Sequence, residues 1–292
     1  MPARRYRNTL VSALAASAVA LAGCSSGSHP APTTSTYDPV GSAGAGTAPA
    51  ASLSPVPTGQ SIAGAKVAGA IRLGLGPQVS AKVRTRVVGG IGASDTTAQG
   101  GDGALTGTET SLRTQLDVRQ GGQTLRVIST PDTVYIRGLL GGTTWARTTS
   151  GLSGTTTTLG GQFRAQTDLA NPWRTLPALT AATSVLSVGP TTLKGTPVSS
   201  YKLTLRPQDS FGLLSPEQRT PDLKKAFQQL KTVLTVSLDR SGHPLRVVTR
   251  VSGTATVGGS RQRIDQTTTV TYSAWGSSVD IATPRSARNL DA

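Results

Sequence analysis

The chain repeatedly alternates apolar with polar side chains, and this period of two constrains its fold more than any other feature. Val83, Thr85 and Val87, for example, alternate with lysine and arginine. Because successive side chains of a β-strand point to opposite faces of the sheet, such a run predicts a strand with one buried and one solvated face. Similar runs occupy residues 112–118, 125–129, 134–136, 198–205, 234–238, 245–251 and 264–272.

Turn residues separate neighbouring runs and indicate how the strands pair. Glycine pairs at 121–122 and 258–259, and the polar segment 239–242, each connect two of the runs. Short connections of this kind favour hairpins, in which the strands are antiparallel. The sequence therefore predicts an antiparallel sheet whose neighbours are mostly consecutive along the chain.

The composition agrees with a strand-rich domain and excludes several classes of protein. Of the 292 residues, 36% are hydrophobic and only 15% are charged, which is unlike a coiled coil. One cysteine and two histidines cannot by themselves build a disulfide framework or a zinc cage. We therefore expect no metal and no cofactor. The folded part is long enough to bury about 70% of the surface that its unfolded chain would expose.

Three segments carry a helical pattern, and one segment is expected to be a loop. A short helix is expected within residues 61–75 and another within 168–184, where Pro172 stands near the start. The strongest helical pattern begins at Ser215. Its apolar stripe consists of Leu223, Ala226, Phe227 and Leu230. The threonine- and glycine-rich segment 151–161 is expected to be a loop.

The N-terminal segment is typical of an exported, lipid-anchored protein. Residues 1–23 combine a basic start with an apolar run that is too short for a transmembrane helix of roughly 20 residues, so they are predicted to be a signal peptide. Leu21-Ala22-Gly23-Cys24 matches the bacterial lipobox, in which Cys24 receives lipid and becomes the new N-terminus. An ordinary signal peptide with an incidental cysteine is disfavoured, because Cys24 is the sole cysteine.

The rest of the chain divides into two parts by composition. Residues 24–60 are rich in proline, serine, threonine and glycine and hold few large apolar side chains, which predicts a flexible, lipid-anchored tether. Residues 61–292 contain the strand and helix patterns and are expected to form one folded domain.

Catalysis is not expected from the residue types present. Asp239, Ser241 and His243 resemble the ingredients of a catalytic triad, but they share one hairpin turn rather than converging in a pocket. Acidic residues are scattered, and the glycine-rich stretches lack the lysine of a phosphate-binding loop. We expect no enzyme activity, and an envelope hydrolase is the least favoured interpretation.

The net charge of +15 points to anionic partners. Most basic residues fall at outward positions of predicted strands, where a solvated sheet surface also explains them. Nucleic acid is disfavoured for an exported chain with few aromatic residues among its basic positions. Anionic lipid headgroups or acidic wall polymers fit better. The candidates for contact with a lipid phosphate are Lys224, Lys225, Arg246 and Arg250.

Beyond the lipobox and the tether, a set of short motifs follows in a recognisable order. They are Val134-Tyr135-Ile136 with a glycine-rich turn and Trp145, Pro172-Trp173 to Leu179, Lys194-Gly195-Thr196-Pro197 before Tyr201, and Tyr272-Ser273-Ala274-Trp275-Gly276 through Val279 to Pro284. In their order and spacing these motifs resemble the actinobacterial LppX/LprG lipoproteins (LppX_LprAFG), over most of the folded part.

This resemblance implies an α+β fold like that of the periplasmic carrier LolA: a strongly curved antiparallel half-barrel wrapped around a few helices. In that family, sheet and helices enclose an apolar cavity that holds acyl chains of envelope lipids. From the residues alone, the alternative stays open that the helices fill this space. The candidate cavity residues are the inward aliphatic positions Val83, Val87, Leu112, Leu116, Leu125, Val127, Val134, Ile136, Leu203, Leu205, Leu234, Val236, Val247 and Val270.

The sequence thus predicts a non-enzymatic lipoprotein on the extracytoplasmic face of the cell membrane, anchored through Cys24. Its expected role is to bind acyl chains of a glycolipid or phospholipid in an apolar cavity and to carry or chaperone that lipid. A membrane transporter is a candidate partner. The alternative is a surface lipoprotein with a filled core that binds wall polymer or a partner protein.

Overall fold

One large sheet dominates the structure, a computed structural model that describes residues 56–91, 99–120, 123–139, 142–149, 155–214, 219–257 and 260–290. Within these residues, thirteen strands pair in the order β1-β8-β9-β10-β11-β12-β2-β3-β4-β5-β6-β7-β13. Neighbouring strands are antiparallel, except that β13 is parallel to β7. The strands are β1 (Ser61–Ile62), β2 (Val79–Ile91), β3 (Gln99–Gly107), β4 (Arg113–Gln120), β5 (Gln123–Ser129), β6 (Thr133–Arg137), β7 (Trp145–Thr149), β8 (Val185–Leu193), β9 (Thr196–Leu205), β10 (Leu230–Leu238), β11 (Pro244–Val257), β12 (Ser260–Ser273) and β13 (Arg288–Asn289).

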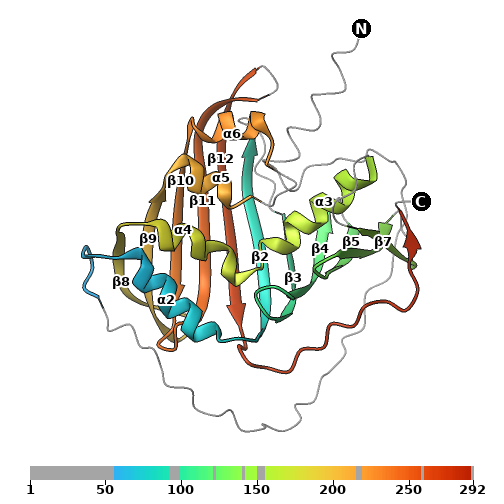
Figure 1. The fold of residues 1–292 in the computed structure, drawn as a ribbon, viewed down its shortest axis with the longest axis horizontal. Helices are drawn as coiled ribbons and strands as arrows, with labels where there is room; N and C mark the ends of the chain where they lie inside the picture. The colour runs from blue at the N-terminus through green and yellow to red at the C-terminus, as the bar shows by residue number, and fades with distance from the viewer. Residues whose placement is uncertain are drawn as a thin grey trace.

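The sheet is open and strongly curved, and the helices lie over one of its faces (Figure 1). The helices are α2 (Gly64–Leu75), α3 (Thr155–Asp168), the 3₁₀-helix η2 (Pro172–Thr175), α4 (Leu176–Ala181), α5 (Pro207–Gly212) and α6 (Pro221–Phe227). In Figure 1, α2, α4 and α5 stand in front of β8 to β12, whereas α3 stands in front of the strands from β4 to β7. This arrangement confirms the predicted α+β fold with a curved antiparallel half-barrel.

The alternation in the sequence decides which side chains the helices cover. In β11, Arg246 and Arg250 are exposed while Val247 is buried. The pairing partner of Val247 in β12 is Val270, which is buried as well. The strands predicted from the runs at 198–205, 234–238, 245–251 and 264–272 are therefore confirmed, as β9, β10, β11 and β12.

A helix occupies part of the segment for which a loop was expected. The prediction of a loop over residues 151–161 is wrong from Thr155 onwards, where α3 begins. Threonine and glycine are poor helix formers, but tertiary packing overrides such propensities. Phe163 of this helix is buried in the core, and the hydroxyl of Thr167 donates to the carbonyl oxygen of Phe163 at 3.2 Å.

The predicted helix that begins at Ser215 exists but is shorter than expected. Its described part, α6, begins after Thr220, whose hydroxyl oxygen accepts from the backbone N–H of Leu223 at 3.3 Å. The helix ends at Phe227, and Leu230, expected in its apolar stripe, is the first residue of β10. Residues 215–218 lie outside the described ranges.

The two other predicted helices are confirmed with changed boundaries. Residues 61–75 form the short strand β1 followed by α2. Residues 168–184 contain η2 and α4 in place of one helix, since the chain passes from 3₁₀ to α geometry at Leu176. The side chain of Asn171 caps η2 by accepting from the backbone N–H of Trp173 at 2.9 Å.

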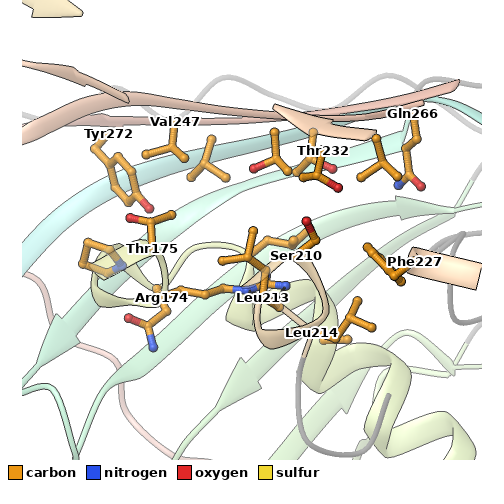
Figure 2. Close-up of a pocket in the computed structure, with 18 residues that line it drawn as sticks. Arg174, Thr175, Ser210, Leu213, Leu214, Phe227, Thr232, Val247, Gln266 and Tyr272 are labelled. Atoms are coloured by element: carbon orange, nitrogen blue, oxygen red, sulfur yellow. Dashed lines mark hydrogen bonds between the residues drawn. The ribbon is translucent and has the colours of Figure 1, made fainter. Parts of the chain in front are cut away.

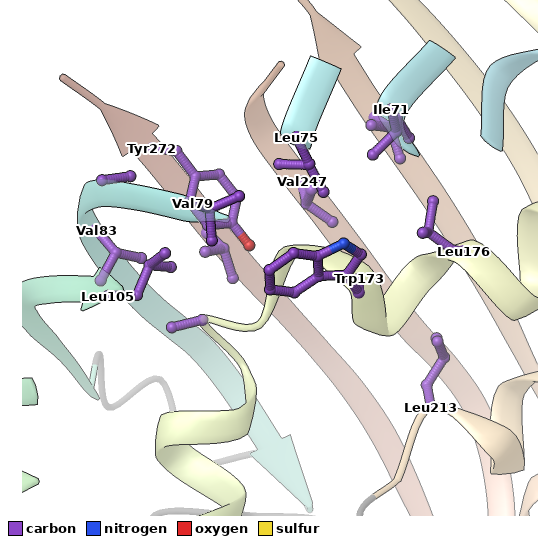
Figure 3. Packing of buried hydrophobic residues seen from close by; sticks show 14 of the residues in the cluster. Ile71, Leu75, Val79, Val83, Leu105, Trp173, Leu176, Leu213, Val247 and Tyr272 are labelled. Carbon is purple, nitrogen blue, oxygen red and sulfur yellow. The ribbon is translucent and has the colours of Figure 1, made fainter. Parts of the chain in front are cut away.

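The main hydrophobic core lies between the sheet and the helices. Figure 3 shows Trp173 at its centre, with Ile71 and Leu75 of α2 on one side and the sheet residues Val247 and Tyr272 nearby. A smaller cluster lies under α6 and includes Leu223, Phe227 and Ile264. Side chains therefore fill the space between the sheet and the helices around Trp173 and under α6.

We expect Leu234→Ala to lower the free energy of unfolding by about 2–5 kcal/mol, because it leaves a cavity in the main core. Leu234 is 0% exposed in β10. The matched control is Leu73→Ala in α2, where the leucine is 70% exposed and the change should stay within about 0.5 kcal/mol. Urea unfolding of both variants checks this, and equal losses would contradict the assigned core.

Candidate functional site

A cleft between the middle of the sheet and the short helices is the candidate site (Figure 2). Its sheet wall is formed by alternate residues of β11 and β12, and strand register places them side by side. The pairs are Val247 with Val270, Thr249 with Thr268, and Val251 with Gln266. Tyr272 of β12 and Thr232 of β10 extend this wall.

The opposite wall comes from short segments of the helix layer. It includes the start of η2, the end of α5 and the end of α6, with the last turn of α3 beside them. Its side chains are mostly apolar, with a few polar groups among them. They are Ala165, Leu169, Asn171, Pro172, Arg174, Thr175, Ser210, Leu213, Leu214 and Phe227.

The cleft is long and narrow. Gln266 and Tyr272 lie at its opposite ends in Figure 2, and the six-residue rise between them along β12 corresponds to about 20 Å. An acyl chain in one leaflet spans about half of a hydrocarbon core of roughly 30 Å. The cavity volume is about 110 Å³, which is small for a cleft of this length.

Arg174 brings a positive charge into this wall. Its Nε donates to the backbone carbonyl oxygen of Leu213 at 2.6 Å, and its Nη2 donates to the same oxygen. Burial lowers the pKa of Arg174, and the nearby Asp168 opposes that shift. An arginine nevertheless keeps its proton in proteins, so the group stays cationic.

A second arginine holds the same turn of chain. The Nη2 of Arg219 donates to the carbonyl oxygen of Gly212 at 2.8 Å, and its Nε donates to that of Leu214 at 3.1 Å. Because the last carbonyl groups of a helix have no partner within it, these two arginines satisfy oxygens at and after the end of α5. They thereby fix the part of the helix-side wall that Leu213 and Leu214 form.

Two hydroxyl groups add polarity to the sheet side. Thr232 is 1% exposed, and its Oγ1 has no hydrogen-bond partner among the described residues. Burial raises the pKa of the Tyr272 phenol, although the charge of Arg174 acts in the opposite direction. Tyr272 therefore stays a neutral hydroxyl near physiological pH, available to donate or accept a hydrogen bond.

An aromatic stack supports the Tyr272 end of the cleft. The ring of Tyr272 stacks on Trp275 at 5.2 Å between centroids, and Trp275 stacks on His243 at 5.3 Å. Asp239 accepts from the backbone N–H groups of Ser241 and His243, each at 2.9 Å. These contacts build the turn between β10 and β11, as expected for the segment 239–242.

The predicted cavity residues divide into those in the cleft and those outside it. Val247 and Val270 line the cleft. Leu203 and Leu205 line a second, more polar pocket of about 210 Å³ near the end of α4. The remaining ones lie in the main core or pack against it: Val83, Leu112, Leu116, Leu125, Val127, Val134, Ile136, Leu234 and Val236. Val87 is buried.

None of the predicted phosphate contacts is among the residues that line the cleft. Arg246 and Arg250 alternate with the inward Val247, and Arg250 pairs with Asp265 at 3.0 Å. Lys224 and Lys225 are exposed on α6. Sequence reasoning missed Arg174 and Thr232. The sequence could have indicated Thr232, because it continues the alternation of Leu234 and Val236. Arg174 could not be predicted in the same way, because it is placed by helices whose boundaries the sequence left uncertain.

Cys24 lies outside the described residues, so its predicted modification stays a prediction. The described end of the predicted tether lies against β8: Gly59 donates to the carbonyl oxygen of Ser187 at 2.9 Å, and Ser187 donates to that of Gln60 at 2.8 Å. Among the described residues, no helix is long and apolar enough to cross a membrane. The same ranges hold no group of three potential metal-ligating side chains.

No protein-family model and no curated protein sequence matches this chain. Similar solved structures include the lipoprotein LppX of Mycobacterium tuberculosis, at 14% identity and a TM-score of 0.43, covering 74% of this chain and 98% of LppX. LprF of Mycobacterium bovis is 12% identical, with a TM-score of 0.44, over 76% of this chain and 96% of LprF.

A LolA superfamily protein of Nitrosomonas europaea is also similar, at 9% identity and a TM-score of 0.28, over 73% of this chain and 90% of that protein. LppX gives its name to the family that the sequence resembles. Because all three TM-scores are below 0.5, the function proposed below rests on the sequence and the cleft of this chain.

The turn at residues 239–242, which supports the aromatic stack, should make the free energy of unfolding depend on pH in the acidic range. Burial opposes ionisation of Asp239, but the hydrogen bonds from His243 and Ser241 prevail, so its pKa lies below the ordinary 3.8. When folding lowers the pKa of a carboxyl group, its ionised form stabilises the folded state at pH values above the pKa of the unfolded state. This stabilisation is lost as the pH falls through the pKa of the folded state. Between about pH 5 and pH 2, the wild type should therefore lose stability that Asp239→Asn does not lose.

Urea unfolding of both proteins across this pH range measures the difference. Asp239→Asn should be less stable than the wild type at pH 7, and the two curves should converge in acid. Parallel curves would contradict the role given to the Asp239 carboxylate.

Proposed function

We propose that this chain is a lipid-anchored lipoprotein that binds an acyl chain of a glycolipid or phospholipid in the cleft and carries or chaperones that lipid outside the cytoplasmic membrane. The observation that supports it most is the elongated cleft, whose walls are largely apolar and lie between the sheet and the helix layer. The proposal involves no chemical step.

Burial of an acyl chain supplies the binding energy. Removing one methylene group from water contributes about 0.8 kcal/mol, so ten of them contribute roughly 8 kcal/mol before the costs of association. The cleft thus needs little headgroup chemistry to hold a lipid. Valine and leucine side chains such as Val247, Val270 and Leu213 provide the apolar surface.

The volume of the cleft indicates that binding must move the wall. A cavity of about 150 Å³ holds one benzene molecule, and this cleft measures about 110 Å³. A complete acyl chain therefore requires the helix layer to move away from the sheet. The segments that would move are short, since α5 has six residues and α6 has seven. Short helices depend on tertiary contacts for their stability, so the burial of the acyl chain must offset the contacts that these helices lose when they shift.

The first test is mass spectrometry of lipids that co-purify with the full chain carrying Cys24→Ser, beside an equally treated control protein. We expect about one lipid per protein. Thr268→Trp should abolish this loading while the fold survives, because the indole would fill the cleft between Thr249 and the helix layer. Thr249→Phe is a second variant of the same kind.

Thr269→Trp is the matched control, because Thr269 is the next residue of β12 and pairs with Val248 on the face away from the cleft. Its lipid content should equal that of the wild type. Lipid loading that is equal in Thr268→Trp, Thr249→Phe and the wild type would exclude the cleft as the site. A folded wild type without any lipid would favour the alternative function, a surface that binds wall polymer or a partner protein.

The proposed anchor has its own test. Cys24→Ser should release the protein from the membrane fraction, because no thiol remains in the chain to carry lipid. Ser25→Ala is the control and should leave the protein membrane-bound. Cell fractionation followed by immunoblotting measures both. Retention of Cys24→Ser in the membrane fraction would show that another feature holds the protein there.

A further inference from the structure

Arg174 gives the cleft a feature that a simple acyl-chain site does not need. A neutral chain that fills the space removes water from the guanidinium and offers it nothing in return, which costs free energy. A chain that carries a negative charge removes the same water but forms a charge-assisted hydrogen bond. Because Arg174 lies in its wall, the cleft is therefore expected to bind an anionic acyl chain more tightly than a neutral one.

We propose that the cleft selects a single acyl chain bearing an anionic group, a carboxylate or a phosphate, and that Arg174 binds this group. This inference rests on the proposed function and names the class of lipid. It concerns the guanidinium of Arg174 and the hydroxyl of Thr232, which face the cleft from its two walls (Figure 2).

The donors of Arg174 are held in place and are not exhausted. Among the described residues, its hydrogen bonds go from Nε and Nη2 to the single carbonyl oxygen of Leu213. A guanidinium has five N–H donors, so further donors are available to a ligand. Because the contact with Leu213 fixes the side chain, an anion would meet a preorganised group and lose little side-chain entropy on binding.

Two arginine side chains lie at this part of the helix-side wall. Asp168 is the carboxylate that acts on Arg174, whereas Arg219 adds a second positive charge beside it. An anionic ligand at this wall would be attracted by Arg174, because water is partly excluded there and electrostatic interactions are stronger than in bulk water.

The Thr232 hydroxyl supplies an independent sign that a polar ligand group belongs here. A buried polar group without a partner is uncommon in folded proteins and calls for a specific explanation. Thr232 is 1% exposed, lines the cleft and has no partner among the described residues. An oxygen atom of a carboxylate or phosphate in the cleft would accept its proton.

The dimensions favour a ligand with a single chain. The cleft is about 20 Å long along β12 and has a volume of about 110 Å³. Two or three chains side by side would require a far larger displacement of the helix layer. A fatty carboxylate and a single-chain phosphate share the required chemistry, and both can be tested directly.

The experiment measures binding of palmitate, hexadecyl phosphate and hexadecanol to the full chain carrying Cys24→Ser, by displacement of the neutral fluorescent probe N-phenyl-1-naphthylamine. These ligands have the same chain length and differ in their head group. We expect both anions to bind about 10- to 100-fold more tightly than hexadecanol, the usual strength of a hydrogen bond to a charged group.

Arg174→Met should remove this preference while hexadecanol binds at least as tightly as before. Arg86→Met is the matched control, since Arg86 is exposed on β2 and pairs with Thr269 on the face away from the cleft. It should leave all three affinities unchanged. Thr232→Val keeps the size of the side chain and should reduce the preference for the anions by about 2- to 10-fold.

The outcomes separate this inference from the proposed function. Equal binding of all three ligands to the wild type, or an undiminished preference in Arg174→Met, overturns the inference while acyl-chain binding stands. Displacement by none of the ligands overturns both. Arg174→Met can fail to fold, because the Leu213 carbonyl loses its donors. In that case, the comparison of the three ligands in the wild type and in Thr232→Val still tests the inference. An unchanged preference for the anions in Thr232→Val counts against the proposed site.

Discussion

The architecture depends on the pairing of β11 with β12 at the middle of the sheet. Each of these strands has 14 residues, and their register runs without a shift from Arg246 with Thr271 to Val257 with Ser260. Because the side chains alternate, this one pairing places Val247 and Val270 on the covered face and Arg246 on the solvated face. A slip of one residue would exchange the two faces along the hairpin, so the register specifies both the core and the cleft.

The helix layer that covers this sheet is packed more extensively in one region than in another. Around Trp173 of η2, buried side chains of α2, α4 and the sheet share the main core and fill the space. Over the neighbouring part of β11 and β12, the cover consists of the ends of short helices, and arginine contacts to backbone oxygens help to hold it. Those contacts join residues of the helix layer to one another and not to the sheet. The same half-barrel therefore has a rigid core at one place and a wall suited to movement beside it.

Much of the fold follows from the sequence, because period-two alternation is local and strong. It located β2, β4, β5, β6, β9, β10, β11 and β12, and the turn residues gave the antiparallel pairing of β4 with β5, of β10 with β11 and of β11 with β12. It did not locate β3, whose glycine-rich sequence shows no alternation, or β8 and α5. Segment 155–161 was predicted to be a loop, since helix propensity alone does not register the burial of Phe163 and the last turn of α3 against the rest of the protein.

The candidate site was predicted less well than the fold, for a physical reason. Alternation shows which residues face inward, but it does not show whether another element fills the space in front of them. Leu116 and Val236 face inward and are completely buried in the core, whereas Val247 and Val270 face inward and meet a cleft. The difference arises from where α5 and η2 end, which depends on tertiary contacts such as that of Arg174 with Leu213. The residue that closes the wall is thus also the one that places a charge in it, so the shape and the selectivity of the cleft have a common origin.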